Sequence, residues 1–345
     1  MTAQGTRSMR YAQQPRLVTL HNRHGMTVTL MDWGATWLSC QVPLADGAPR
    51  EVLLGCANAE LYDRQQVYLG ATIGRYANRI ANAHLPYPNG DRQLVASQGC
   101  NLLHGGQVGF DKQRWSILEH SLRHVRFLLN SPDGDQGFPG NLDIEVTYTL
   151  DDDNSLSVRM RARSDQLTPV NLTNHAYFNL DGVNGDVRQH QLQVRAARML
   201  PIDGAGIPLG DIASVDGTGF DFRHPKRLAQ DFLQDEQQKI AKGYDHSFVL
   251  DAAGTQTDDW AARLTSGDGR LTLELATTLP ALQLYTGNYL AGTPARDGGE
   301  YRDYSGVALE PQFLPDSPHH PEWPQPSCWL AAGQVYDHTI CYRFR

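Results

Sequence analysis

LDIEVTYTLDDDNSLSVRMRA, residues 142–162, is the stretch of sequence that decides the fold class. Apolar and polar residues alternate on both sides of the central DDDN. The apolar series is Leu142, Ile144, Val146, Tyr148 and Leu150, followed by Leu156, Val158 and Met160. Successive side chains of a strand point to opposite faces, so each half is a strand with one apolar face. Residues 151–154 have the composition of a turn, and the stretch therefore predicts a β-hairpin.

The same alternation recurs along the chain, in residues 18–30, in 192–194 and in 271–275 after the turn SGDG. Strands with one apolar and one polar face suit antiparallel sheets that pack face to face. Residues 228–241, LAQDFLQDEQQKIA, show the clearest helical pattern, and we expect one short helix there. The sequence has no GxGxxG after a strand, no P-loop and no βαβ rhythm, which argues against Rossmann-like and TIM-barrel folds.

Glycine and proline are spread along the chain as turn residues, and no tract of them forms a linker. A length of 345 residues is compatible with two domains, but large all-β folds often reach this length as one. We therefore expect a single all-β domain over residues 17–345, a large antiparallel β-sandwich with few short helices. Residues 1–16 are expected to be a flexible N-terminal segment.

Composition excludes several functional classes. Hydrophobic residues make up 40% and the formal net charge is −8, which indicates a globular protein and argues against a nucleic-acid binder. The N-terminus has no apolar core of a signal peptide, and no apolar run is long enough to cross a bilayer. The five cysteines are odd in number and form no CxxC pair. We expect a reduced, cytoplasmic protein that binds neither nucleic acid nor membrane.

The 13 histidines raise the question of a metal. His120 and His124 are four residues apart, but they lie in a strand-like stretch where this spacing does not bring ligands together. His319 and His320 lie in a proline-rich loop. Without an HExxH motif or a facial triad, the sequence predicts no metal.

Two polar segments interrupt the strand pattern in the first third of the chain. GRYANRIANA, residues 74–83, contains Asn78 and Arg79, and NLLHGG, residues 101–106, places His104 before two glycines. Glycines let a ligand approach the backbone closely. These residues could bind hydroxyl groups, but pattern alone favours solvated loops.

VNLTNHAYFNL, residues 170–180, is the richest polar segment. On a strand, His175 and Tyr177 project from the same face. A polar face is costly to bury unless it is hydrogen-bonded, so this face suits a wet, concave cleft. A structural histidine whose hydrogen bonds are satisfied is an equally good interpretation.

Three later segments add further candidates. Asp245 stands in KGYDHSFVL, Gln283 shares one strand face with Tyr285 in TTLPALQLYTGN, and Glu310 follows an apolar run. Burial of a glutamate at such a position would raise its pKa toward the range useful to a general base. A solvent-exposed strand end is nevertheless the commoner place for glutamate.

Taken together, the motifs carry a resemblance. They are GRYANRI, LLHGG with GFDKQRW, SPDGDQGFPGN, TPVNLTNHAYFNL, GYDHSF, LQLYTGN and LEPQFLPDSPHHPEWP. In this order and spacing, from about residue 17 to the C-terminus, the chain resembles the aldose 1-epimerase (galactose mutarotase) family. The resemblance implies a β-sandwich of the galactose mutarotase type, an open sugar cleft and no cofactor.

The resemblance also implies roles for single residues. It makes His175 the general acid and Glu310 the general base. The implied substrate-binding residues are Asn78, Arg79, His104, Tyr177, Asp245 and Gln283. The implied reaction interconverts the α and β anomers of free hexoses such as galactose and glucose, by ring opening, rotation about C1–C2 and reclosure. Local differences are small: Pro311 follows the implied base directly, and HHP occurs at 319–321.

Three alternatives remain at this level. A hexose-6-phosphate 1-epimerase on the same fold would need extra cationic groups at the rim of the cleft. A non-catalytic sugar-binding module would be expected to lack either His175 or Glu310, and both are present. A glycoside hydrolase would need two carboxyl groups, for which Asp245 and Glu310 are the evident pair. A free aldohexose is the expected ligand, and no obligate protein partner is evident.

Overall fold

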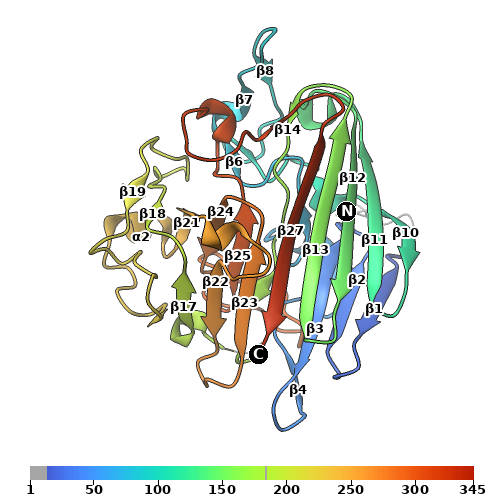
Figure 1. Cartoon of the computed structure of the whole chain (residues 1–345), viewed down its shortest axis with the longest axis vertical. Helices are drawn as coiled ribbons and strands as arrows, with labels where there is room; N and C mark the ends of the chain where they lie inside the picture. The colour runs from blue at the N-terminus through green and yellow to red at the C-terminus, as the bar shows by residue number, and fades with distance from the viewer. Residues whose placement is uncertain (1–13, 183–184) are drawn as a thin grey trace, which may run out of the picture.

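Antiparallel sheets make up most of the structure, a computed structural model that describes residues 14–182 and 185–345 (Figure 1). The α-helices of this part are both short: α1 (Ala59–Arg64) and α2 (Glu236–Ala241). The all-β prediction is thus confirmed. The predicted N-terminal segment 1–16 lies, except for residues 14–16, outside the described residues. No helix in the described part of the chain is long and apolar enough to cross a membrane.

The largest sheet has nine strands in the order β10-β11-β12-β13-β27-β23-β22-β17-β20. Their bounds are β10 (Ser116–His120), β11 (His124–Ser131), β12 (Leu142–Leu150), β13 (Ser155–Ser164), β17 (Gln191–Val194), β20 (Lys226–Arg227), β22 (Ala262–Thr265), β23 (Thr272–Thr277) and β27 (Val335–Phe344). The long strands β11, β12, β13 and β27 run side by side in Figure 1. β12 and β13 pair in antiparallel register from Leu142↔Ser164 to Leu150↔Leu156, so the predicted hairpin is confirmed.

A six-stranded sheet carries most of the site, in the order β16-β25-β24-β21-β18-β19. Its strands are β16 (Tyr177–Phe178), β18 (Arg198–Met199), β19 (Ala213–Ser214), β21 (Asp245–Val249), β24 (Ala281–Tyr285) and β25 (Val307–Gln312). Leu284 and Leu309, paired across β24 and β25, belong to the same hydrophobic core as Ile144 of β12. The alternate positions, with the pair Gln283 and Glu310, therefore face the other way, which leaves that face of the sheet for chemistry.

Smaller sheets complete the fold. A four-stranded sheet contains β1 (Leu17–His21), β2 (Thr27–Met31), β3 (Thr36–Pro43) and β4 (Pro49–Glu51). Short ladders pair β5 (Thr72–Ile73) with β15 (Thr173–Asn174), β6 (Arg79–Ile80) with β9 (Leu102–Leu103), β7 (His84–Leu85) with β8 (Arg92–Gln93), and β14 (Thr168–Pro169) with β26 (Trp329–Leu330). One hydrophobic core extends along the chain from Val18 to Phe344. This continuity supports our proposal that residues 17–345 form one domain.

The helix expected over residues 228–241 is only partly right, because α2 covers Glu236–Ala241. Asp231 and Leu233 adopt φ values of 60° and 59°, which a right-handed helix does not allow. The Asp235 side chain then accepts the N–H of Gln237 at 2.8 Å and caps the start of the helix. The first half of the apolar pattern therefore folds as turns.

The strand expected over residues 170–180 is interrupted. β15 ends at Asn174 and β16 begins at Tyr177, so His175 and Ala176 lie between two short strands. The Asn174 side chain accepts the N–H of Ala176 at 3.1 Å, which replaces ladder bonding by a local side-chain turn. The break places His175 at the cleft instead of in a regular ladder.

Candidate active site

A cleft of about 620 Å³ lies over the free face of the six-stranded sheet. The β6–β9 segment and the loop 202–206 form other parts of its wall. The predicted site residues that line the cleft are Asn78, Arg79, His104, His175, Tyr177, Asp245 and Glu310. The fold thus brings together residues from segments that are far apart in the sequence.

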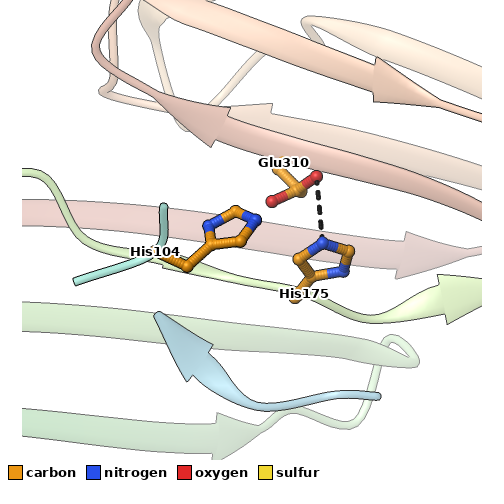
Figure 2. Close-up of side chains that lie close together, drawn as sticks. All are labelled: His104, His175 and Glu310. Atoms are coloured by element: carbon orange, nitrogen blue, oxygen red, sulfur yellow. Dashed lines mark ion pairs between the residues drawn. The ribbon is translucent and has the colours of Figure 1, made fainter. Parts of the chain in front are cut away.

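Glu310 and His175 face each other at the bottom of the cleft (Figure 2). The Nε2 atom of His175 lies 3.6 Å from Oε1 of Glu310, and their side chains are 4% and 2% exposed. Burial raises the pKa of Glu310 well above its ordinary value; nearby Asp245 adds to this and Arg79 opposes it. Burial lowers the pKa of His175 to about 4. Desolvation therefore favours the uncharged form of both groups.

The pair also has unused hydrogen-bonding atoms. Nδ1 of His175 and Oε2 of Glu310 form no hydrogen bond to any residue that the structure describes. Buried polar atoms without partners are uncommon, because desolvation is then uncompensated. The site thus keeps polar atoms free on both members of its buried ionisable pair.

His104 is locked to Asn78. The N–H of Asn78 donates to Nδ1 of His104 at 3.1 Å, and the N–H of His104 donates to the carbonyl of Asn78 at 3.1 Å. Because Nδ1 accepts, the neutral ring carries its proton on Nε2. Burial lowers the pKa of His104 well below its ordinary value, and His175 is the next largest cause. His104 therefore offers a neutral N–H donor at the cleft.

His104, His175 and Glu310 are also the group in the described chain with the donor set of a metal site, with ligand atoms within 4.8 Å of one another. A metal-binding histidine normally donates its outer ring N–H to a carbonyl or carboxylate. The outer nitrogen of His104 instead accepts an N–H, which leaves Nε2 protonated and without a free lone pair. This chemistry suits hydrogen bonding better than metal ligation.

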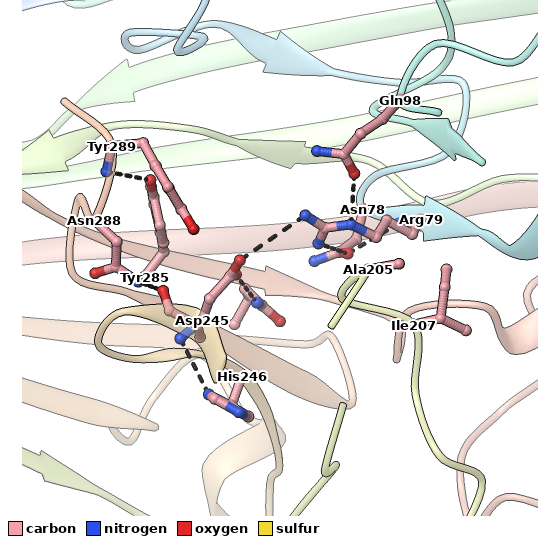
Figure 3. A network of polar contacts seen from close by, with 12 residues as sticks. Asn78, Arg79, Gln98, Ala205, Ile207, Asp245, His246, Tyr285, Asn288 and Tyr289 are labelled. Atoms are coloured by element: carbon pink, nitrogen blue, oxygen red, sulfur yellow. Dashed lines mark hydrogen bonds and ion pairs between the residues drawn. The ribbon is translucent and has the colours of Figure 1, made fainter. Parts of the chain in front are cut away.

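Arg79 and Asp245 form a charged pair across another part of the cleft (Figure 3). Arg79 donates from Nε to Gln98 at 2.8 Å, and its terminal nitrogen lies 4.0 Å from Oδ2 of Asp245. Gln283 donates from Nε2 to Oδ1 of Asp245 at 2.6 Å. These bonds hold both charges in defined positions before any ligand binds.

Gln283 is the predicted site residue that is not part of the cleft lining. It is buried behind Asp245, and its amide oxygen accepts the hydroxyl of Ser247. Both ends of the amide are therefore used within the protein. The structure connects Gln283 to the cleft through Asp245.

Besides the predicted Tyr177, two further aromatic residues lie around His175 that sequence reasoning did not assign to the site. Tyr68 stacks on the ring of His175 at 5.7 Å and packs edge-on against His104 at 4.6 Å. Tyr285 lies 6.4 Å from His175, on the strand face that it shares with Gln283. That shared face was a usable signal for Tyr285, whereas no pattern in the sequence around Tyr68 distinguishes it. The cleft-lining loop 202–206 was missed as well.

A family model described as aldose 1-epimerase matches residues 16–343. The chain belongs to the aldose 1-epimerase family. It is 54% identical over 332 residues to the aldose 1-epimerase of Escherichia coli (strain K12), covering 96% of each protein. It is 40% identical over 323 residues to the galactose mutarotase of Homo sapiens, covering 92% of this chain and 91% of that one.

Solved structures of aldose 1-epimerase relatives share the fold. A GalM/aldose epimerase homologue from C. elegans superimposes with a TM-score of 0.88 at 30% identity, covering 96% of this chain and 99% of that chain. A galactose 1-epimerase from Lactobacillus acidophilus NCFM gives a TM-score of 0.84 at 32% identity, covering 98% and 97%. The resemblance seen in the sequence and the galactose mutarotase type of β-sandwich are therefore both confirmed.

Proposed function

We propose that this protein is an aldose 1-epimerase that interconverts the α and β anomers of free aldohexoses such as galactose and glucose. The buried pair of His175 and Glu310 carries the proposal, because it places an acid and a base 3.6 Å apart in the cleft of a chain from this family. Each positioned proton transfer typically contributes about 10²–10⁴-fold to a rate, so a covalent intermediate is not needed.

The reaction requires two coupled proton transfers. In our proposal Glu310 takes the proton of the anomeric hydroxyl O1 while His175 gives a proton to the ring oxygen O5, and the C1–O5 bond breaks. The open aldehyde rotates about C1–C2. On reclosure the new C1–O5 bond forms, Glu310 returns a proton to O1, and His175 takes the proton from O5.

Burial of the pair acts on both ends of this sequence: it penalises the charged forms with which ring opening starts and favours the uncharged forms with which it ends. Ring opening starts with a carboxylate and an imidazolium and ends with a carboxylic acid and a neutral imidazole. Since burial raises the pKa of Glu310 and lowers the pKa of His175, the forms that follow ring opening are the ones that desolvation stabilises. The bound O1 hydroxyl, by donating to Glu310, supports the carboxylate at the start.

The other cleft residues hold the sugar. Arg79 and Asp245 present a fixed donor and a fixed acceptor for hydroxyl groups, and His104 presents its Nε2–H. Asn78 and Tyr177 line the same cleft. We infer that Gln283 acts on the sugar indirectly, by fixing Asp245. Such positioning leaves only the anomeric centre free to reorganise.

The charge of the cleft favours a free sugar over a sugar phosphate. Among the described residues that line the cleft, Arg79 is the one arginine or lysine. Its terminal nitrogen already lies 4.0 Å from the carboxylate of Asp245. A phosphate group usually binds several donors from arginine, lysine or a helix N-terminus.

We also propose a cytoplasmic location. The free cysteines are Cys40, Cys56, Cys100, Cys328 and Cys341. Unpaired cysteines are typical of proteins in a reducing compartment.

Polarimetry tests the proposed function. Freshly dissolved α-D-galactose and α-D-glucose should reach anomeric equilibrium faster with the protein than without it. Glu310→Gln and His175→Asn should each lower kcat by about 10²–10⁴-fold. Glu300→Gln and His224→Asn, matched changes at exposed positions, should leave it unchanged. Wild-type rates in both site variants would refute the roles of the pair, and an inactive wild type would refute the function.

A further inference from the structure

Residues 203–207 form a turn that overlaps the cleft-lining loop 202–206. Hydrogen bonds within the turn hold its shape. Oδ1 of Asp203 accepts the N–H groups of Ala205 at 2.8 Å and Ile207 at 2.9 Å. The N–H of Asp203 donates to the carbonyl of Ile207 at 2.8 Å. These hydrogen bonds close the turn on itself and fix its backbone shape.

This turn lies directly against Arg79, and Figure 3 shows Ala205 of the turn near the Arg79 side chain. At Gly206, with φ 78°, an added Cβ would stand 2.7 Å from Cζ of Arg79. There is no space between the backbone of the turn and the guanidinium. The position of the turn therefore limits where Arg79 can lie.

Gln237 of α2 attaches the turn to the body of the protein. Its Oε1 accepts the N–H of Ile202 at 2.7 Å, and its Nε2 donates to the carbonyl of Ile202 at 3.1 Å. Both backbone groups of the residue before the turn are thus bound by one side chain. Gln237 is not part of the cleft lining, and its hydrogen bonds to Ile202 are its direct link to the turn that is.

His246 holds Gln237 from the opposite side. Nδ1 of His246 accepts the N–H of Asp245 at 3.1 Å, so the neutral ring carries its proton on Nε2. Nε2 lies 3.3 Å from Oε1 of Gln237 and donates to it. His246 is fully buried, and burial lowers its pKa to about 3, so the ring stays neutral and keeps this bond at physiological pH.

We propose that Gln237, held by His246, is a positioning residue that sets sugar affinity by fixing the turn 203–207 against Arg79. The inference rests on the proposed function and adds to it a determinant outside the cleft. The turn lies beside Arg79, which binds the sugar in our proposal, and proton transfer belongs to His175 and Glu310. Loss of the hydrogen bonds between Gln237 and Ile202 should therefore weaken sugar binding and leave the chemical step intact.

The test separates KM from kcat in steady-state mutarotation of α-D-galactose. Gln237→Ala should raise KM about 5- to 10-fold, the effect of losing one or two neutral hydrogen bonds, with kcat within about twofold of wild type. Gln237→Glu keeps the acceptor but loses the Nε2 donor. Its KM should lie between those of wild type and Gln237→Ala. Gln234→Ala, an exposed glutamine in the turn before α2, should behave as wild type.

His246 supplies a second pair of variants. His246→Leu removes the donor to Gln237 together with the acceptor for the N–H of Asp245, and should raise KM at least as much as Gln237→Ala does. His246→Gln restores an N–H at similar reach and should return KM toward wild type, a rescue that general loss of packing would not give.

Unchanged KM in both Gln237 variants, or kcat falling in proportion in folded protein, would overturn the proposal. The Kd of galactose measured by calorimetry distinguishes failure of the proposed function from failure of the role proposed for Gln237. An inactive wild type that binds galactose would refute the proposed function, and the Kd of each variant would still decide the role of Gln237.

Discussion

Replacing Glu310 by glutamine is expected to stabilise the protein at neutral pH while it removes most of the activity. The carboxyl group is 2% exposed, and Oε2 has no hydrogen-bond partner among the described residues. Burial raises its pKa well above the ordinary value. The native state therefore keeps a proton that the unfolded chain releases above a pH of about 4.3.

The sign and size of the stability difference between Glu310→Gln and wild type follow from proton linkage. A native state that binds more protons than the unfolded state loses stability as pH rises, by about 1.4 kcal/mol per pH unit up to the native pKa. Glutamine has no such proton. The free energy of unfolding of Glu310→Gln should therefore gain on wild type as the pH rises from 5 to 7, with a slope of up to about 1.4 kcal/mol per pH unit.

Urea unfolding followed by tryptophan fluorescence at pH 5, 6 and 7 measures this difference, and polarimetry measures the activity of the same samples. Glu300→Gln, at an exposed glutamate, is the matched control and should show no pH-dependent gain. A stability difference that stays constant or shrinks with rising pH would refute the reasoning, because the buried carboxyl would then be ionised in the native state.

Three further predictions concern the wall of the cleft and its supports. Gly206→Ala should destabilise the protein by about 1–2 kcal/mol, because φ is 78° there, and should raise KM; Gly204→Ala, with open space around it, is the control in thermal unfolding, and equal effects would contradict the argument. Gln283→Leu should release Asp245 and raise KM about tenfold with little change in kcat, which initial rates by polarimetry can check. On lowering the pH from 7 to 5, wild type should lose about 2 kcal/mol more stability than His246→Gln, since the unfolded chain protonates a histidine whose native pKa is about 3; equal losses in urea titrations would exclude this.

The sheets could be predicted because their signal is local. In the hairpin 142–162, alternation, turn composition and burial all agree, and the pairing of β12 with β13 follows directly. The two departures have local causes that apolar pattern does not report. Leu233 and Asp231 take left-handed backbone angles before α2, and Asn174 turns the chain at His175. In each case a short-range hydrogen bond or backbone angle prevails over periodicity.

For the site, the motifs indicated segments that meet at the cleft but not the contacts within it. Gln283 was predicted among the residues that bind sugar, and only the structure shows that its amide is hydrogen-bonded to Asp245 and Ser247. Tyr68 and the turn 203–207 had no distinguishing pattern, since their place at the cleft depends on which distant segments pack beside them.

By itself, the sequence determined the all-β architecture, the family and the residues His175 and Glu310 as the pair to examine. Only the tertiary structure decided that these two lie 3.6 Å apart and almost without solvent. The physical reason is that a pKa depends on the water removed around a group and on charges that distant segments bring close. Neither quantity can be deduced from the residues next to Glu310 or His175 in the sequence. The preference of both groups for the uncharged form, and the hydrogen bonds that hold the turn 203–207 beside Arg79, therefore follow only from the packed fold.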